Sequence, residues 1–274
     1  MNIKHDIYLI SDSTGETLDR IFLAIKAQFS NFNCKTIHYS FTRTKNQLDN
    51  IISKSKTEKN VIFLYTIVDN ELSKYLVSEA QKNNIPCFEA LGSLILNFSK
   101  LLNQKASHIP SGQHVLNEEY YNRIEAIQFT MSHDDGNLIN DIEKSDIILL
   151  GVSRTSKTPT SIYLANKGLK RSNIPLVNEY SIPTLLKKKP KIACVVGLTS
   201  EAERLLDIRK NRMNTLQETE NIDYTNFENI SKEIEDAKKT FKKYKWPVID
   251  VTRKSVEEIA ASVIKIYEIS KENV

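Results

Sequence analysis

The chain has 274 residues, of which 40% are hydrophobic and 26% charged, and its formal net charge is +4. These values are ordinary for a globular protein, and so small a charge gives no support to nucleic-acid binding, which we do not expect. No apolar run is as long as a membrane span, the first residues show no signal-peptide pattern, and the three cysteines have no zinc spacing. We therefore expect a cytoplasmic protein with no membrane role.

The first hundred residues alternate between strand-like and helix-like segments. The strand-like segments are apolar or β-branched runs, and each is followed by an amphipathic segment with helical spacing. The expected strands span 6–11, 35–41, 60–68 and 85–90, and the expected helices span 16–29, 45–54, 70–82 and 93–102. This alternation predicts a parallel sheet with helices on both faces.

A polar stretch with Pro110 and Gly112 follows and predicts a domain boundary. We expect an N-terminal α/β domain over 1–104, a connecting segment over 105–145 with a helix at 120–129, and a second α/β domain over 146–274 that is P-loop kinase-like. In the second domain we expect strands at 146–150, 175–178, 192–197 and 247–251, and helices after residue 157 and at 199–212, 227–241 and 256–269.

The most informative segment is Gly151-Val-Ser-Arg-Thr-Ser-Lys-Thr158, which lies between an expected strand and an expected helix. A phosphate-binding P-loop has this order, because loop amides and the helix dipole together attract an anion. Lys157 would contact terminal phosphates, and Thr158 would hold Mg²⁺ or a phosphate oxygen. The residues expected to bind the nucleotide are Gly151, Val152, Ser153, Arg154, Thr155, Ser156, Lys157 and Thr158.

One position of this segment departs from the usual P-loop pattern. Ser156 replaces the second glycine, which normally lets the backbone approach the phosphate without a Cβ. Serine is small and can donate a hydrogen bond, so phosphate binding remains the favoured interpretation. The alternative is an ordinary turn between a strand and a helix.

His133-Asp134-Asp135-Gly136 lies just before the strand that leads into this loop. A histidine and two carboxylates could hold Mg²⁺ or accept a proton from a hydroxyl nucleophile. His133, Asp134 and Asp135 therefore join Lys157 as catalytic candidates. Asp-Asp-Gly is also an ordinary turn sequence, which is the alternative for this motif.

Three arginines fall on or beside the helix expected at 199–212. Arg204, Arg209 and Arg212 could stabilise the charge that spreads over a transferred phosphoryl group. A solvated basic helix with surface ion pairs is an equally good interpretation.

The segment Ser11-Asp-Ser-Thr-Gly-Glu-Thr17 ends the first expected strand and begins the following helix. Ligands bind at the carboxyl ends of strands in open α/β sheets, so Ser11, Ser13 and Thr14 could bind an anion or a phosphorylated partner. Alternatively, Ser13 or Thr14 is simply the N-cap of the helix.

Together these motifs resemble those of the bacterial pyruvate, phosphate dikinase regulatory proteins, a family that also contains regulators of phosphoenolpyruvate synthase. The resemblance runs in order over nearly the whole chain, and it is carried by residues 11–17, 133–136, 151–161, 196–199 and 249–252. In the synthase regulators the loop more often has Gly-Lys, so Ser156 before Lys157 favours the dikinase type.

The resemblance implies a bifunctional enzyme. It would phosphorylate a threonine of the dikinase with ADP as the donor, and this phosphorylation would inactivate the dikinase. The catalytic histidine of the dikinase must itself be phosphorylated for this reaction. In the reverse reaction inorganic phosphate attacks the phosphothreonine and pyrophosphate is released. We also expect a divalent metal such as Mg²⁺, and a homodimer.

Two other classes of function fit the same loop. A small-molecule kinase would transfer phosphate from ATP, but it rarely needs about a hundred extra residues with their own sheet. A non-catalytic module would sense ADP and transfer nothing, and it would keep its signalling when Asp134 or Asp135 is replaced.

Overall fold

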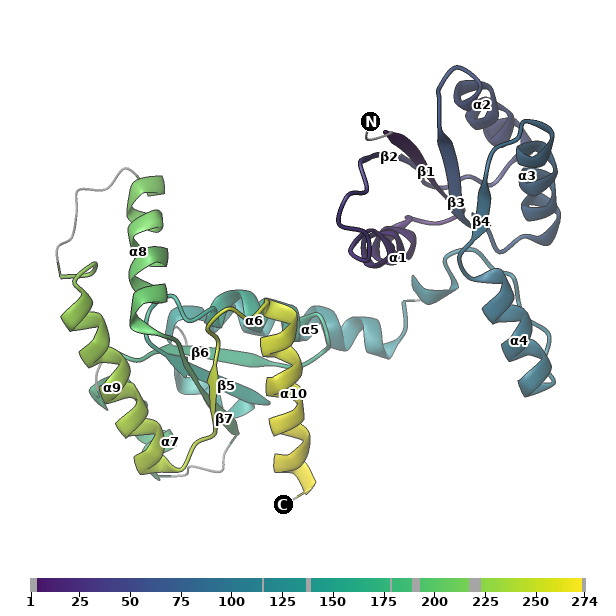
Figure 1. Cartoon of the computed structure of the whole chain (residues 1–274). Helices are drawn as coiled ribbons and strands as arrows, with labels where there is room; N and C mark the ends of the chain where they lie inside the picture. The colour runs from purple at the N-terminus through teal and green to yellow at the C-terminus, as the bar shows by residue number, and fades with distance from the viewer. Residues whose placement is uncertain are drawn as a thin grey trace. The chain divides into compact units, whose positions relative to one another are not determined.

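The computed structural model describes residues 4–114, 116–136, 139–177, 179–188, 193–216 and 223–272. The chain divides into two compact units, residues 1–115 (unit 1) and 116–274 (unit 2), as Figure 1 shows. Each unit is built on its own four-stranded parallel sheet, which confirms the predicted α/β class. The boundary lies at residue 115, within the polar stretch predicted as the boundary, and most of the expected connecting segment belongs to unit 2.

Unit 1 has four parallel strands in the order β2-β1-β3-β4. The strands are β1 (His5–Ser11), β2 (Cys34–Tyr39), β3 (Val61–Thr66) and β4 (Cys87–Glu89). The helices are α1 (Glu16–Lys26), α2 (Lys45–Ser55), α3 (Asn70–Lys82) and α4 (Gly92–Leu102), and a 3₁₀ turn, η1, spans Gly112–His114.

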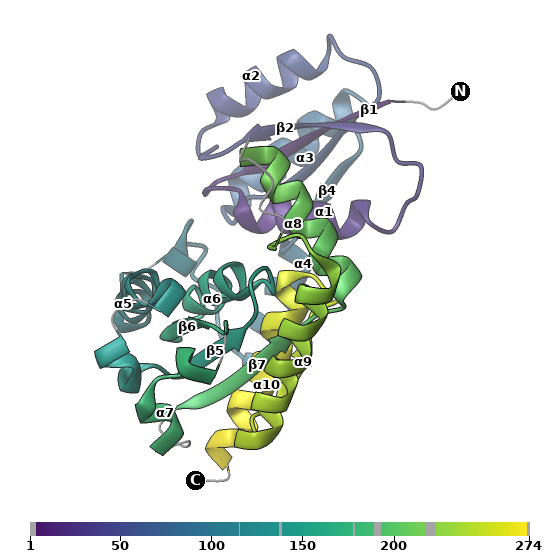
Figure 2. The ribbon, with the colours of Figure 1, turned by 90° about the vertical axis from the view of Figure 1, so that its left-hand side faces the viewer.

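The period-two alternation of β1 divides the core of unit 1 into two layers. Tyr8 and Ile10 face α2 and α3 in one hydrophobic cluster, whereas Ile7 and Leu9 face α1 in another. Figures 1 and 2 show α2 and α3 together on one face of this sheet and α1 on the other. Helices therefore cover both faces, as the apolar strands predicted.

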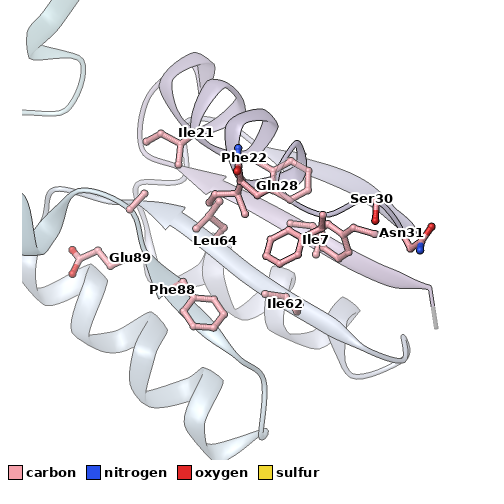
Figure 3. A pocket seen from close by; sticks show the side chains of 14 residues that line it. Ile7, Ile21, Phe22, Gln28, Ser30, Asn31, Ile62, Leu64, Phe88 and Glu89 are labelled. Atoms are coloured by element: carbon pink, nitrogen blue, oxygen red, sulfur yellow. The ribbon is translucent and has the colours of Figure 1, made fainter. Parts of the chain in front are cut away.

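The α1 side of the sheet is only partly covered. An apolar groove of about 960 Å³ lies between α1 and the β4 edge, lined by side chains such as Phe22, Leu64 and Phe88 (Figure 3). Helix α4 follows β4 and buries none of its residues, although its sequence is apolar; Leu101, for example, is 80% exposed. Unit 1 thus presents both an apolar groove and an apolar helix to the solvent.

Unit 2 repeats the strand order of unit 1, as β6-β5-β7-β8. Its strands are β5 (Ile147–Gly151), β6 (Arg171–Pro175), β7 (Cys194–Thr199) and β8 (Val248–Asp250). Its helices are α5 (Glu118–Ser132), α6 (Lys157–Ala165), α7 (Thr184–Lys188), α8 (Ala202–Leu216), α9 (Phe227–Tyr244) and α10 (Val256–Glu272), with 3₁₀ turns η2 (Asp134–Gly136), η3 (Ile139–Lys144) and η4 (Glu179–Ser181). None of the helices described in either unit is both long and apolar enough to cross a membrane.

The two faces of this second sheet are covered by different helices. Ile148 and Leu150 pack with residues of α7, α8 and α9, whereas Ile147 and Leu149 pack with residues of α6 and α10. Figure 1 shows the α8–α9 pair and α10 on opposite sides of the strands. The helices thus form a layer on each side of a fully buried β5.

Helix α5 belongs to unit 2 because it is bonded to the edge of the sheet. Thr130 Oγ1 accepts a hydrogen bond from the Arg171 amide at 3.1 Å, and Glu125 forms an ion pair with Lys170 at 2.6 Å. The expected independent connection is therefore an integral part of the second unit.

Strand β6 shows where the expectation for the second sheet was wrong. It spans Arg171–Pro175, whereas a strand at 175–178 was expected, and Asn178 lies outside the described residues. The polar residues at its start were not included in the expected strand, yet Arg171, Ser172 and Asn173 are all buried. The expected start of the next strand, Ile192, also lies outside the described residues, and β7 is described from Cys194.

Candidate functional site

The segment from Gly151 to Thr158, here called the 151–158 loop, leaves β5 and enters α6. Arg154 and Ser156 have positive φ angles of 74° and 59°, which is the left-handed region that glycine favours. A Cβ at Gly151 would lie 2.5 Å from Thr155 Oγ1 and 2.7 Å from the Leu198 carbonyl oxygen, so only glycine fits there. The loop is thus a tight turn at the carboxyl end of a central strand.

Lys157, the first residue of α6, turns its side chain back into the loop. Its Nζ donates hydrogen bonds to the carbonyl oxygens of Gly151 at 2.8 Å and Val152 at 3.0 Å. Burial lowers the pKa of Lys157 to about 8, an effect that the nearby carboxylates of Asp135 and Asp134 oppose. An anion bound beside this buried amine would favour its charged form.

The turn η2 brings two carboxylates to this loop. Thr158 Oγ1 donates a hydrogen bond to Asp134 Oδ1 at 3.1 Å, and Asn173 Nδ2 on β6 donates to the same oxygen. Asp135 has a left-handed φ of 51°, is exposed, and receives no hydrogen bond from the described residues. The structure therefore brings Asp134 and Asp135 together with Lys157 and Thr158, and it distinguishes an anchored carboxylate from a free one.

Asn173 is a site residue that sequence reasoning missed. Its amide oxygen accepts a hydrogen bond from Ser161 Oγ on α6 at 2.6 Å, and its amide nitrogen holds Asp134. It was missed because the strand that carries it was placed four residues too late. Had the strand been placed correctly, an asparagine within a buried strand would have indicated a polar site, because a buried amide group needs hydrogen-bond partners.

His133 lies behind the turn and does not face the loop. It is only 4% exposed, its ring stacks on Phe129, and its Nδ1 lies 2.8 Å from the Phe129 carbonyl oxygen. Its main-chain carbonyl accepts a hydrogen bond from the Asn173 amide at 3.0 Å. These contacts make His133 a support for the Asp134–Asp135 turn.

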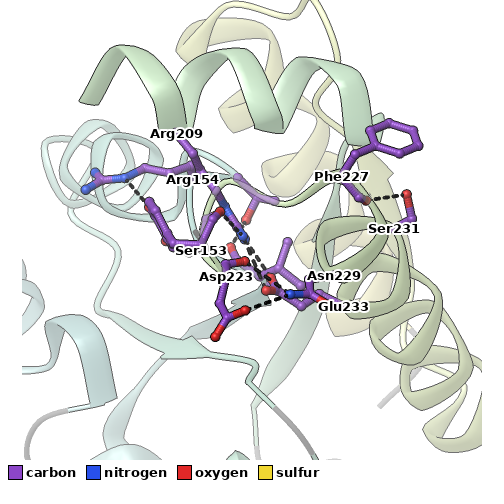
Figure 4. Close-up of polar contacts among 12 residues, drawn as sticks. Ser153, Arg154, Arg209, Asp223, Phe227, Asn229, Ser231 and Glu233 are labelled. Atoms are coloured by element: carbon purple, nitrogen blue, oxygen red, sulfur yellow. Dashed lines mark hydrogen bonds and ion pairs between the residues drawn. The ribbon is translucent and has the colours of Figure 1, made fainter. Parts of the chain in front are cut away.

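The three candidate arginines have different environments on α8. Arg204 and Arg212 are exposed and form no ion pair with any described residue. Arg209 is fully buried and pairs with Glu233 of α9 at 2.6 Å (Figure 4). Of the three, only Arg209 reaches the loop, through a 3.4 Å hydrogen bond to the Ser153 carbonyl oxygen.

Ser11, Ser13 and Thr14 occupy the corresponding place in unit 1, where β1 ends and α1 begins. They line a cavity of about 200 Å³, and Ser13 Oγ lies 2.8 Å from Ser111 Oγ. The helix N-cap is Gly15, with a φ of 91° and no side-chain cap, so the alternative that Ser13 or Thr14 is the N-cap does not hold. The hydroxyl groups thus remain at the cavity wall.

Asp12 lies beside these hydroxyl groups and is buried. Its Oδ2 accepts a hydrogen bond from the Val68 amide at 2.7 Å, and its carbonyl oxygen accepts one from Arg43 Nε at 2.7 Å. Burial raises the pKa of the Asp12 carboxyl group. The cavity of unit 1 therefore combines hydroxyl groups, a buried carboxyl group and an uncapped helix start.

Thr158 Oγ1 and Asp134 Oδ1 place oxygen atoms of the kind that Mg²⁺ favours beside the 151–158 loop. Within the described ranges, no cluster of three or more His, Cys, Asp or Glu residues could hold a metal ion alone. Mg²⁺ usually takes only one or two carboxylates and completes its shell with water and phosphate oxygens. Thr158 and Asp134 fit such a site, but only together with a phosphate ligand.

Comparison with known proteins assigns the chain to a family. The family model described as kinase/pyrophosphorylase matches residues 7–264. A pyruvate, phosphate dikinase regulatory protein, so named, of Pelagibacter ubique is 69% identical over the full length of both chains. Proteins of the same name from Sphingopyxis alaskensis and Anaplasma marginale are 44% and 41% identical, covering 96% of this chain and 96% and 93% of their own. The chain belongs to the kinase/pyrophosphorylase family, as its motifs predicted.

Proposed function

We propose that this protein regulates pyruvate, phosphate dikinase by ADP-dependent phosphorylation of a target threonine and by phosphate-dependent removal of the same group. The contact between the 151–158 loop and the Asp134–Asp135 turn carries the proposal, because it joins an anion-binding loop to a proton acceptor. Family membership and the names of the relatives support a phosphotransferase with this target. The cytoplasm is the compartment we propose for it.

In the forward reaction the loop would bind the two phosphates of ADP. Backbone amides at the start of α6 and the charged Lys157 would stabilise the negative charge that develops between the phosphates. The threonine hydroxyl oxygen attacks the β-phosphorus, the bond from that phosphorus to the bridging oxygen breaks, and AMP leaves. The kinase loop of this proposal comprises all eight residues from 151 to 158.

Asp135 is the carboxylate that we propose as the proton acceptor. Asp134 is held by hydrogen bonds from Thr158 and Asn173, so its Oδ1 is already occupied. Asp135 is exposed and close enough to Lys157 to be the largest charge effect on its pKa. The threonine proton would therefore pass to Asp135 as the oxygen attacks.

The same pocket would serve the reverse reaction. An oxygen of inorganic phosphate attacks the phosphorus of phosphothreonine, the bond to the threonine oxygen breaks, and pyrophosphate leaves. The released threonine oxygen takes back a proton from Asp135. Thr158 and Asp134 would hold Mg²⁺, which would neutralise phosphate charge when bound.

Target recognition is assigned to unit 1. Ser11, Ser13 and Thr14 lie at an uncapped helix start, where amide groups and hydroxyl groups suit a phosphorylated partner. We propose that they bind the phosphohistidine form of the dikinase. The exposed Arg204 and Arg212 are the further candidates for contacts with the target.

We also propose a homodimer. Helix α4 and the groove beside α1 are both apolar and uncovered in unit 1, and a two-fold contact would bury these features in both copies at once. A second copy is the occupant because it supplies the helix and the groove in equal number. Light scattering should give about twice the mass of 31.4 kDa, and a monomer at micromolar concentration would contradict it.

The proposed function is tested by measuring its products. Purified protein, ADP and histidine-phosphorylated dikinase should yield AMP and a phosphothreonine in the dikinase, measured by chromatography and mass spectrometry. Asp135→Asn should lower kcat by about 100-fold or more because the proton acceptor is lost. Asp141→Asn, which changes a half-exposed carboxylate in η3, is the matched control and should retain full activity. Transfer from ATP to a small molecule, with none from ADP, would refute the proposal.

A further inference from the structure

The side chain of Arg209 joins three parts of unit 2 at the start of the 151–158 loop. Its two terminal nitrogens bind both carboxylate oxygens of Glu233, at 2.6 and 3.3 Å. The same nitrogens donate to the carbonyl oxygens of Tyr224 at 3.2 Å and Ser153 at 3.4 Å. Figure 4 shows the guanidinium group of Arg209 between Ser153 and Glu233. One buried cation therefore links α8, α9 and the loop.

The pairing with Glu233 determines what Arg209 can do. Arg209 is fully buried, and a buried guanidinium group that lost its carboxylate would be an uncompensated charge. Turning toward a phosphate would require it to leave that carboxylate. Both terminal nitrogens of Arg209 are thus engaged, and one of them contacts the loop through the Ser153 carbonyl group.

Tyr224 extends this contact to the side chains of the loop. The Arg209 guanidinium carbon lies over the Tyr224 ring, 4.6 Å from the ring centre. The Tyr224 hydroxyl oxygen lies 3.1 Å from Ser153 Oγ and accepts a hydrogen bond from Arg154 Nε at 3.3 Å. Both consecutive residues at the start of the loop are thus tied to the same tyrosine.

The residues held in this way are those that need support. Arg154 has a φ of 74°, which lies in the left-handed region where a non-glycine residue is strained. Such a conformation persists only where the surroundings impose it. The contacts from Arg209 and Tyr224 are placed where they can impose it on Ser153 and Arg154.

We propose that Arg209, Glu233 and Tyr224 form a positioning device that holds Ser153 and Arg154 in the conformation that binds a nucleoside diphosphate. The identity of the ligand rests on the proposed function, whereas the conformational role does not. The device would serve both directions of the reaction, because both use the same loop. Arg209 is thus a positioning residue and not a catalytic residue.

Two readouts test the proposal with the full-length protein. In Arg209→Lys and Glu233→Gln, hydrogen exchange at the amides of residues 153–155 in the ligand-free protein should become about fivefold faster or more. The KM for ADP should rise about 10-fold while kcat stays within about threefold, because a charge-assisted contact to the loop is lost and the reacting groups are unchanged.

The matched controls lie on the same helices. Lys210→Met removes an exposed charge next to Arg209, and Glu235→Gln removes an exposed carboxylate two residues from Glu233. Neither should alter exchange in the loop or the KM for ADP. Tyr224→Phe, which keeps the ring over Arg209, is the second test and should raise the KM about fivefold because only the hydroxyl contacts are lost.

The outcomes separate this inference from the proposed function. Unchanged loop exchange in both Arg209→Lys and Glu233→Gln would overturn the positioning role, whatever the protein does with ADP. A fall in kcat with an unchanged KM would also overturn it, since Arg209 would then act on the transition state. If the wild type transfers nothing from ADP, the proposed function fails, while faster loop exchange in the variants still supports the positioning role.

Discussion

Lys157 illustrates how one residue combines folding and chemistry. Its amine is buried among loop carbonyl groups, with Asp135 and Asp134 close by. Burial disfavours the charged form, so the pKa falls from 10.5 to about 8 in spite of the carboxylates. The residue is therefore charged at neutral pH and loses its proton in mildly alkaline solution.

This pKa gives a prediction for the dependence of activity on pH. In the proposed function charged Lys157 attracts the phosphates of ADP, so kcat/KM for ADP should fall as the pH rises through about 8, by about tenfold between pH 7 and pH 9. The profile is measured with initial rates at low ADP. A constant kcat/KM up to pH 9.5 would show that the amine keeps its proton or does not contact ADP.

Two positions of the loop, 151 and 156, should respond differently to a change in side-chain size. Gly151→Ala should abolish ADP binding or folding of unit 2, because the new Cβ would lie 2.7 Å from the Leu198 carbonyl oxygen. Ser156→Gly should be tolerated and should not lower the free energy of unfolding, because glycine favours the φ of 59° found there. Denaturant unfolding and ADP titration measure both. Equal losses in the two variants would contradict this account.

Among the secondary-structure elements, the apolar strands were the most predictable. The runs at 6–11 and 60–68 correspond to β1 and β3, because continuous apolar sequence has few alternatives to a buried strand. Ser255, just before α10, and Glu258 in its first turn form reciprocal hydrogen bonds of 3.2 and 2.8 Å, the arrangement that a serine followed three residues later by a glutamate indicates at a helix start. Local rules of this kind act within a few residues and can be read from sequence.

Strand β6 was unpredictable for the opposite reason. Ser172 lies 2.7 Å from Ser145, and Asn173 bonds to Ser161 and Asp134, so its polar side chains find partners far along the chain. No local pattern reports such partners. The loop and the Asp134–Asp135 turn were recognisable as motifs, whereas Asn173, Glu233 and Tyr224 became visible only when the fold brought them to the loop.

Asn173 gives a prediction at this scale. Asn173→Leu should leave the strand in place but remove one of the two hydrogen bonds that hold Asp134, and kcat should fall about tenfold because the turn that carries Asp135 loses part of its anchor. Ser161→Ala removes a hydrogen bond to Asn173 yet leaves the Asn173–Asp134 contact, so it should retain most of the activity. Phosphate transfer and far-UV circular dichroism provide the readouts. Equal activity in the two variants would argue against this anchor.

At the scale of the whole molecule, two units share one strand order and place a loop after the first strand of each sheet. Each unit contains two buried hydrophobic clusters of its own. A core of this kind is what allows a domain to fold alone. The loop with Lys157 lies entirely within unit 2, whereas Ser11, Ser13 and Thr14, which we propose for target recognition, lie in unit 1.

This division predicts the behaviour of residues 116–274 expressed alone. The fragment should unfold cooperatively and bind ADP within about threefold of the affinity of the full chain, because the loop and its supports belong to one unit. It should fail to inactivate the dikinase, because it lacks Ser11, Ser13 and Thr14, the residues proposed for target recognition. Calorimetry and the dikinase activity assay test the two parts. Full inactivation by the fragment would remove unit 1 from target recognition.

The central claim is that the 151–158 loop transfers the β-phosphate of ADP to a threonine. The most direct measurement uses ADP labelled on its β-phosphate, with histidine-phosphorylated dikinase as the acceptor. The account predicts label on a dikinase threonine, loss of this label in Lys157→Ala, and release of labelled pyrophosphate when inorganic phosphate is added. Threonine labelling that persists unchanged in Lys157→Ala, or no labelling by the wild type, would contradict it.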